Sequence, residues 1–103
     1  MNKKQIAIDF AKSLNNPEIN KIILYGSVAR GDENEKSDID ILILTNNKKD
    51  KNIISDDVYD IVWDILMKTG QYISAKINYV KNYEENKNLS FFSNVDKEGV
   101  IIG

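Results

Sequence analysis

The stretch ILYGSVARGDENEKSDIDILIL, residues 23–44, holds two strand-like runs separated by a polar loop. The first run ends at Gly26, and the loop closes with Asp38 and Asp40 at the start of the second run. Beyond Asp40, apolar residues occupy both alternating faces, which is typical of a central, covered strand. The placement of two carboxylates at the start of a buried strand therefore needs an explanation, and that explanation bears on the function.

The two carboxylates share one face of the predicted strand, because Asp38 and Asp40 lie two residues and about 6.5 Å apart. Two ionised carboxylates about 5 Å apart repel by roughly 3 kcal/mol at an effective dielectric constant near 20. Protonation or solvent exposure would relieve this repulsion, but the strand that follows is apolar and barely reached by solvent. A Mg²⁺ ion relieves it better, since proteins hold Mg²⁺ with one or two carboxylates plus substrate phosphates. We therefore predict a metal site at this pair.

The segment before the carboxylates has the chemistry of a phosphate site. Gly26 allows backbone N–H groups to approach an anion, and a helical turn that starts at Ser27 would direct its free donors toward it. Ser27 adds a hydroxyl, Arg30 adds a permanent charge, and Ser37 can fix the loop beside Asp38. Each feature alone is ordinary turn or cap chemistry, and the combination favours a functional site.

Hydrophobic periodicity predicts the remaining elements. The order helix, strand, strand, helix, strand, helix indicates an α+β fold, a small mixed sheet with helices packed on one face. The predicted helices are 3–15, a single turn at 27–31, 53–69 and a weak helix within 82–98. The predicted strands are 19–26, 38–45, 71–80 and a short edge strand at 100–102. Loops are expected at 32–37 and 46–52.

The helix at 53–69 carries an apolar stripe and ends at Gly70. Asn52 or Ser55 is its candidate N-cap. Trp63 departs from the stripe, and we expect it to cover the flank of the helix. Asp60 and Asp64 are expected on its solvated side.

Composition excludes several classes of function. The 103 residues include 14 basic and 16 acidic side chains, which argues against extensive binding to a nucleic-acid backbone. Cysteine and histidine are absent, so a structural zinc site lacks its usual ligands. No run is long and apolar enough for a secretory leader or a membrane span. We expect one domain, 1–103, acting in the cytoplasm without a membrane partner, and its oligomeric state stays open.

Residues 26–43, GSVARGDENEKSDIDILI, resemble the signature of the DNA polymerase β nucleotidyltransferase superfamily. The length resembles that of minimal nucleotidyltransferases, which pair with HEPN-domain proteins as antitoxin and toxin. The resemblance implies a polymerase β palm-like fold in which Asp38 and Asp40 are catalytic and hold two Mg²⁺ ions. It further implies that Gly26 and Ser27, with Arg30 and Ser37 beside them, bind ATP, and that AMP is transferred to a hydroxyl, most plausibly a Tyr of a HEPN partner.

The chain departs from the superfamily pattern at one point. Active members usually carry a third carboxylate on the strand after the second helix, whereas 71–80 contains no Asp or Glu. Its polar face offers Ser74, Lys76 and Asn78 instead. An alternative is therefore a nucleotide-binding module that neutralises its partner with little or no turnover. A weaker alternative is transfer to small molecules, for which a second, acceptor-binding domain would be needed.

Overall fold

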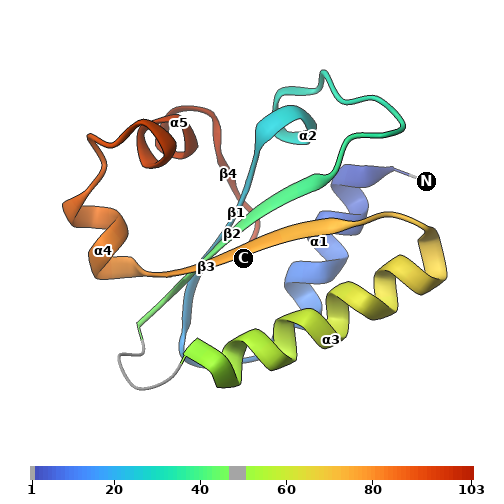
Figure 1. Cartoon of the computed structure of the whole chain (residues 1–103), viewed down its shortest axis with the longest axis horizontal. Coiled ribbons are helices and arrows are strands. Elements are labelled where there is room, and N and C mark those ends of the chain that lie inside the picture. Colours follow the sequence, from blue (N-terminus) through green and yellow to red (C-terminus); the bar gives the residue numbers. More distant parts are fainter. Residues whose placement is uncertain (1, 47–50) are drawn as a thin grey trace.

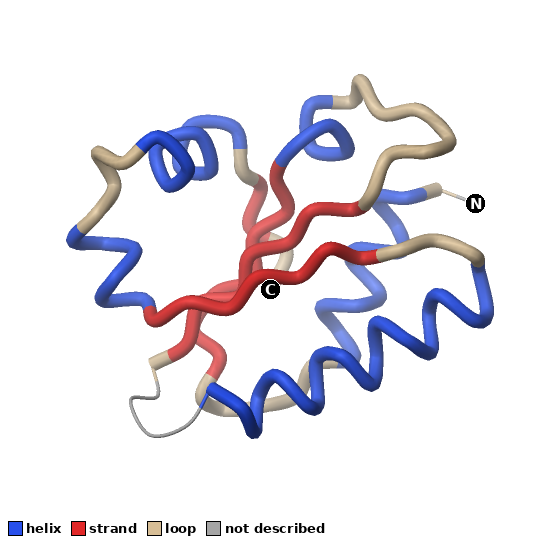
Figure 2. Tube along the Cα trace, in the orientation of Figure 1, coloured by secondary structure: helices blue, strands red, loops and turns tan. Residues whose placement is uncertain are grey.

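The computed structural model describes residues 2–46 and 51–103, and within these ranges four strands form one mixed sheet in the order β3-β2-β1-β4 (Figures 1 and 2). The central pair β1 and β2 is antiparallel, β3 runs parallel to β2, and β4 runs antiparallel to β1. The strands are β1 (Ile19–Tyr25), β2 (Ile39–Thr45), β3 (Ile73–Tyr79) and β4 (Val100–Ile101). The α+β fold and the short edge strand are thus confirmed.

The strand register fixes the neighbours of Asp40. On one side Asp40 pairs with Tyr25, the last residue of β1. On the other side it pairs with Ser74 of β3. Since β2 has a partner along both edges, Asp40 lies between the end of one strand and the beginning of another.

Helices cover both faces of the sheet, so the prediction that they pack on one face is wrong. Along β2, Ile39, Ile41 and Ile43 pack in one cluster with α1 (Lys3–Ser13) and α3 (Lys51–Thr69). Leu42 and Leu44 face the opposite way and pack with α4 (Val80–Glu85) and α5 (Ser90–Glu98), which Figure 1 shows away from α1 and α3. The physical reason is that β2 is apolar on both faces and each face needs a cover.

The C-terminal helices were predicted only as a loop followed by a weak helix. These helices cover the sheet with aromatic side chains. Tyr83 of α4 and Phe92 of α5 meet edge to face, with ring centroids 5.4 Å apart. Phe91 meets the ring of Tyr25 in the same manner at 5.5 Å. These contacts join α4 and α5 to the end of β1.

Helix boundaries differ from prediction at several points. Asn2 caps α1 through its side-chain oxygen, which accepts from the N–H groups of Lys4 and Gln5 at 2.8 and 3.3 Å. The turn α2 (Gly26–Arg30) starts and ends one residue earlier than predicted, and its C-cap Gly31 has a φ of +82°. Helix α3 begins at 51, so the predicted caps, Asn52 and Ser55, lie inside it.

The predicted loop 46–52 overlaps α3 at its end, and residues 47–50 lie outside the described ranges. The stop at Gly70 is confirmed by its φ of +73°. Among the described helices, none has the length and apolar character needed to cross a membrane.

Candidate active site

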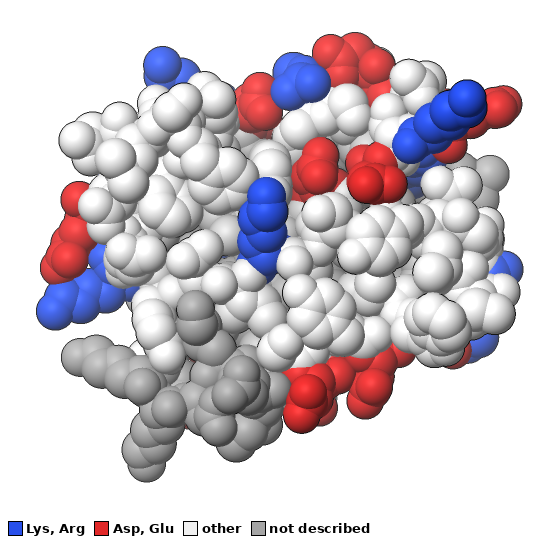
Figure 3. Space-filling view, in the orientation of Figure 1, with Lys and Arg blue, Asp and Glu red and all other residues white. Residues whose placement is uncertain are grey.

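Asp38 and Asp40 lie on either side of Ile39, which is fully buried beneath the sheet. Asp40 is the second residue of β2 and is half-buried, whereas Asp38 precedes the strand and is exposed. The N–H of Ile39 donates to the carbonyl oxygen of Tyr72 at 3.0 Å, which anchors this point of the chain to the start of β3. Figure 3 shows acidic side chains close together over the beginning of β2, with a basic side chain nearby.

The electrostatics of Asp40 reflect its burial and its neighbour Asp38. Burial, and then repulsion from Asp38, raises the pKa of Asp40 above its ordinary value, while Lys76 and Arg30 oppose this shift. Asp38 is exposed, contrary to the expectation that solvent barely reaches the pair, so the predicted cost falls on the half-buried Asp40. A cation at the pair would remove it.

Gly26 leaves room for the Asp40 carboxylate. Its φ is +75°, and a Cβ atom on it would collide with Oδ2 of Asp40 and lie 3.3 Å from Cγ. The backbone of Gly26 thus approaches the carboxylate as no other residue could. Asp40 lies against the backbone of Gly26 and beside a second carboxylate, Asp38. This arrangement is suited to binding a hard divalent cation together with a phosphate group.

The turn α2 places Ser27 and Arg30 on the β1 side of the carboxylates. Tyr25 occupies its N-cap position and no side chain caps it, so its first N–H groups have no helical acceptor. Arg30 is engaged elsewhere: its Nε donates to Asp32 at 3.1 Å and its Nη1 to Glu98 of α5 at 3.1 and 3.2 Å.

Ser37 fixes the loop before Asp38, as predicted. Its hydroxyl accepts from the N–H of Asn34 at 3.0 Å. Its carbonyl accepts from the Nζ of Lys3 at 2.6 Å, and the same Nζ donates to the carbonyls of Asn34 at 2.7 Å and Glu35 at 3.2 Å. One ammonium group from α1 therefore holds three carbonyls of this loop.

Sequence reasoning missed Lys3, which is 8% exposed. A signal was present, because Lys3 occupies the same helical stripe as Ile6, Ala7 and Phe10. A lysine on a buried stripe requires acceptors for its charge.

Sequence reasoning also missed Tyr25. Its hydroxyl is buried and has no hydrogen-bond partner among the described residues. Burial, and then the charge of Asp40, raises the pKa of Tyr25 to about 12. The hydroxyl therefore stays neutral, an unpaired donor near the carboxylate pair.

Strand β3 supplies the other side of the site. Ser74 is level with Asp40, and Lys76 follows on the same face, where its Nζ lies 4.9 Å from the centroid of the Phe91 ring. In the described part of the chain no group of three or more acidic side chains is close enough to share a metal ion. The third carboxylate that is missing from the sequence of β3 is therefore not supplied by another described segment either.

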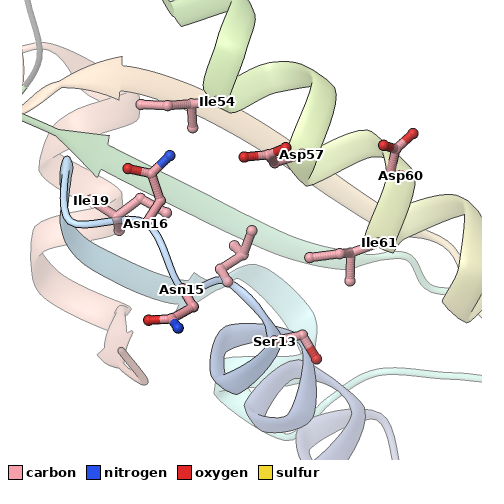
Figure 4. A pocket seen from close by; sticks show the side chains of 9 residues that line it. Ser13, Asn15, Asn16, Ile19, Ile54, Asp57, Asp60 and Ile61 are labelled. Carbon is pink, nitrogen blue, oxygen red and sulfur yellow. The ribbon is translucent and has the colours of Figure 1, made fainter.

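A cavity of about 340 Å³ lies at the opposite end of the sheet (Figure 4). It is bordered by Ile19, the first residue of β1, and by Asp57 and Asp60 of α3, whereas Tyr25 at the far end of β1 is the partner of Asp40. Its other lining residues are Ser13, Leu14, Asn15, Asn16, Ile54 and Ile61. The cavity is thus separate from the carboxylate pair.

Comparison with known proteins identifies the family of the chain. Residues 8–103 match the family model described as Polymerase beta, Nucleotidyltransferase. The chain belongs to the polymerase β nucleotidyltransferase family. It is accordingly a nucleotidyltransferase, and the site of Asp38 and Asp40 lies within the segment that matches the family.

Individual relatives agree with this family. MJ0604 of Methanocaldococcus jannaschii, named provisionally as a protein adenylyltransferase, is 36% identical over 99% of both chains. A crystal structure of a toxin–antitoxin with AMP-PNP aligns with a TM-score of 0.61 at 20% identity, covering 100% of this chain and 73% of the other. The structure of a tri-AMPylated HEPN toxin of Shewanella oneidensis in complex with MNT antitoxin aligns with a TM-score of 0.54 at 17% identity. The alignment covers 97% of this chain and 71% of the other. These two structures share the nucleotidyltransferase fold.

Proposed function

We propose that residues 1–103 form one domain that transfers AMP from ATP to a hydroxyl group of a partner protein in the cytoplasm. The observation that carries this proposal is the half-buried Asp40, held against the bare backbone of Gly26 and beside Asp38. This arrangement has excess negative charge, an open backbone donor surface and no histidine for acid–base chemistry. Phosphoryl and nucleotidyl transfer require positioning and charge neutralisation more than proton transfer by side chains.

In this proposal Asp38 and Asp40 hold two Mg²⁺ ions and are the catalytic residues. Bound Mg²⁺ would neutralise phosphate charge and stabilise the attacking and leaving oxygens. Gly26 and Ser27 bind the triphosphate through backbone and hydroxyl donors, Arg30 adds a guanidinium, and Ser37 keeps Asp38 in position.

The proposed reaction is a single displacement. The acceptor oxygen forms a bond to the α-phosphorus of ATP, and the bond from that phosphorus to the bridging oxygen of the β-phosphate breaks. Pyrophosphate leaves, and the hydroxyl proton passes to water.

A HEPN-domain protein is the proposed partner, and this chain is the proposed antitoxin. The support is the similarity in fold to the two toxin–antitoxin structures, one of which contains an AMPylated HEPN toxin. The similarity to a relative named as a protein adenylyltransferase supports AMP as the group and a protein as the acceptor.

A second candidate is a nucleotide-binding module that neutralises its partner without turnover. The observation in its favour is Ser74, which stands level with Asp40 on β3 where a carboxylate could join the pair. With two carboxylates alone, nucleotide binding would persist while activation of the acceptor weakened.

Labelled ATP separates the two candidates. The purified chain is incubated with Mg²⁺, ATP labelled on the α-phosphate and a HEPN-domain protein. Label on the partner that is lost with Asp40→Asn supports the transferase. A complex that forms equally with Asp40→Asn, and carries no label, supports the module. If Mg²⁺-ATP raises the melting temperature of neither the chain nor its complex, both candidates fail.

A further inference from the structure

Four large apolar side chains are exposed along one border of the sheet. Tyr59, Trp63 and Met67 follow one another at intervals of four residues on α3, and Tyr72 lies just before β3. Their exposed fractions are 48%, 64%, 65% and 45%, respectively. We refer to these four residues as the aromatic face. Trp63 does not cover the helix flank as the sequence suggested, and side chains of these types are favoured in protein interfaces.

The aromatic face begins at the carboxylate pair. The carbonyl of Tyr72 accepts from the N–H of Ile39, the residue between Asp38 and Asp40. The parallel pairing of β2 with β3 begins at Ile39 and Ile73, so Asp38 and Tyr72 are the residues that directly precede this pair.

The aromatic face continues along the open edge of β3. The hydroxyl of Tyr59 donates to the carbonyl of Ala75 in β3 at 3.4 Å, which ties α3 to this strand. Within the described sheet β3 pairs only with β2, so this edge has no further strand beside it. Asp40 lies on the face of Leu42, and α3 covers the other face, so a segment bound to the aromatic side chains reaches the carboxylates by passing over the open edge of β3.

If AMP is transferred as proposed above, the geometry of the reaction places the acceptor on the β3 side of the carboxylates. Gly26 and Ser27, which would bind the triphosphate, lie on the β1 side of Asp40. In an in-line displacement the attacking oxygen approaches the phosphorus from the side opposite to the leaving group. Since β2 lies between β1 and β3, the opposite side is that of β3.

Charge specifies the occupant. Asp56, Asp60 and Asp64 form an exposed row on α3 at the same four-residue interval, beside the stripe of Tyr59, Trp63 and Met67. Of these, Asp64 pairs with Lys68 at 3.0 Å, and no described cation pairs with Asp56 or Asp60. A second copy of the chain would bring two such rows together, which repel each other in a two-fold symmetric contact.

We propose that the aromatic face is the docking surface for the acceptor protein, and that its occupant is a basic, apolar segment that presents a hydroxyl-bearing side chain to Asp38 and Asp40. Apolar groups of the segment pack on Trp63 and Met67, and its Lys or Arg side chains reach the row of Asp60. The surface thereby selects the acceptor by charge and shape on the side of the site opposite to the nucleotide.

Trp63 is the single tryptophan of the chain, so its fluorescence reports on this face alone. The probe is a synthetic amphipathic peptide of Leu and Lys that carries one Tyr, titrated into the full chain with Mg²⁺-ATP. A Leu–Glu peptide of the same pattern is its control. We expect the Leu–Lys peptide to shift Trp63 emission to shorter wavelength, and its affinity to fall at least about fivefold in Asp60→Lys and in Met67→Gln.

Ile101→Gln is the matched variant, because Ile101 is 63% exposed and lies on β4, at the other edge of the sheet. It should leave peptide affinity unchanged. The proposal is overturned if the Leu–Lys peptide does not bind, if the Leu–Glu peptide binds equally, or if Met67→Gln and Ile101→Gln weaken binding alike. Self-association of the chain that Asp60→Lys strengthens would identify a second copy as the occupant and would also overturn it.

Melting temperatures with and without Mg²⁺-ATP, taken on the same samples, separate this proposal from the proposed function. Stabilisation by Mg²⁺-ATP without peptide binding defeats the docking surface alone. Peptide binding without stabilisation defeats the nucleotide site alone.

Discussion

The Nζ atom of Lys3 lies 2.6 Å from the carbonyl oxygen of Ser37, the residue immediately before Asp38. This contact connects the first helix, on one face of the sheet, to the loop that delivers a carboxylate to the site. Lys3 is buried, and among the described residues its charge is compensated by the carbonyls that it holds.

Replacing Lys3 with Met keeps the aliphatic stem and removes the donors. We expect Lys3→Met to lower the free energy of unfolding by about 2 kcal/mol, the scale of hydrogen bonds from a charged group. It should also reduce the stabilisation by Mg²⁺-ATP, because Asp38 loses its support. Lys4→Met is the control, since Lys4 is exposed and its side chain makes no hydrogen bond within the described chain. Denaturant unfolding checks this, and equal losses in the two variants would refute it.

Gly26→Ala should abolish nucleotide binding. The added methyl group strains a backbone at φ +75°, at a cost of roughly 1 to 2 kcal/mol, and displaces the Asp40 carboxylate. Gly70→Ala has the same backbone strain at φ +73° with nothing within 4 Å of the new methyl group. Both variants should lose stability through backbone strain, Gly26→Ala the more because of the collision with Asp40, while only Gly26→Ala loses the shift in melting temperature with Mg²⁺-ATP. Retained binding in Gly26→Ala would exclude the close approach as a requirement.

Asp40 should impose a pH dependence on the metal-free chain. Its pKa is raised above 3.8 on folding, so the native state keeps this proton to a higher pH than the unfolded chain. The resulting stability is complete below pH 3.8 and is lost as the pH rises through the raised pKa. Asp40→Asn does not titrate, so its melting temperature should rise relative to the wild type as the pH increases through the raised pKa of Asp40. Melting curves in EDTA test this, and a difference that is constant with pH would contradict it.

Glu98→Gln should strengthen nucleotide binding. Glu98 holds the guanidinium of Arg30 at 3.1 Å, and neutralising this partner releases Arg30 toward a phosphate. We expect Mg²⁺-ATP affinity to rise about two- to fivefold, with a change in stability below about 1 kcal/mol because the pair is partly exposed. Glu85→Gln, which removes an exposed pair with Lys81, should change neither quantity. Calorimetric titration measures both, and an unchanged affinity in Glu98→Gln would show that Arg30 is not needed by the nucleotide.

Ser74→Asp should supply the carboxylate that β3 lacks. Because residue 74 is level with Asp40, we expect Mg²⁺ affinity to rise about fivefold, or about 1 kcal/mol, and AMP transfer to increase. Asn78→Asp adds the same charge to the same face of β3, but level with Leu44, and should have little effect. Metal titration compares them, and equal gains would mean that general charge rather than position is responsible.

Local pattern was sufficient to predict that the backbone of Gly26 and the side chain of Asp40 lie close together. Gly26 and Asp40 belong to one strand–loop–strand segment, in which alternation fixes the faces and the glycine marks the end of β1. The third strand and its lack of a carboxylate were equally visible, since the pairing of Ser74 with Asp40 follows once β3 lies parallel to β2.

Contacts between distant segments were beyond prediction. Lys3 reaches Ser37 across 34 residues and Arg30 reaches Glu98 across 68, and no spacing rule encodes either pair. The short helices α4 and α5 carry too few residues for a clear periodicity, so their packing over Leu42 and Leu44 was missed. These contacts and this packing depend on which residues become buried in the folded chain. A single sequence indicates burial only through its hydrophobic periodicity.

The polar Ser74 has a consequence for the cell's ATP supply. If the function proposed above holds, a nucleotide-loaded chain without its target would activate a water molecule as poorly as any other nucleophile. Idle hydrolysis would then be slow, and the loaded protein could persist in readiness until a suitable target arrived.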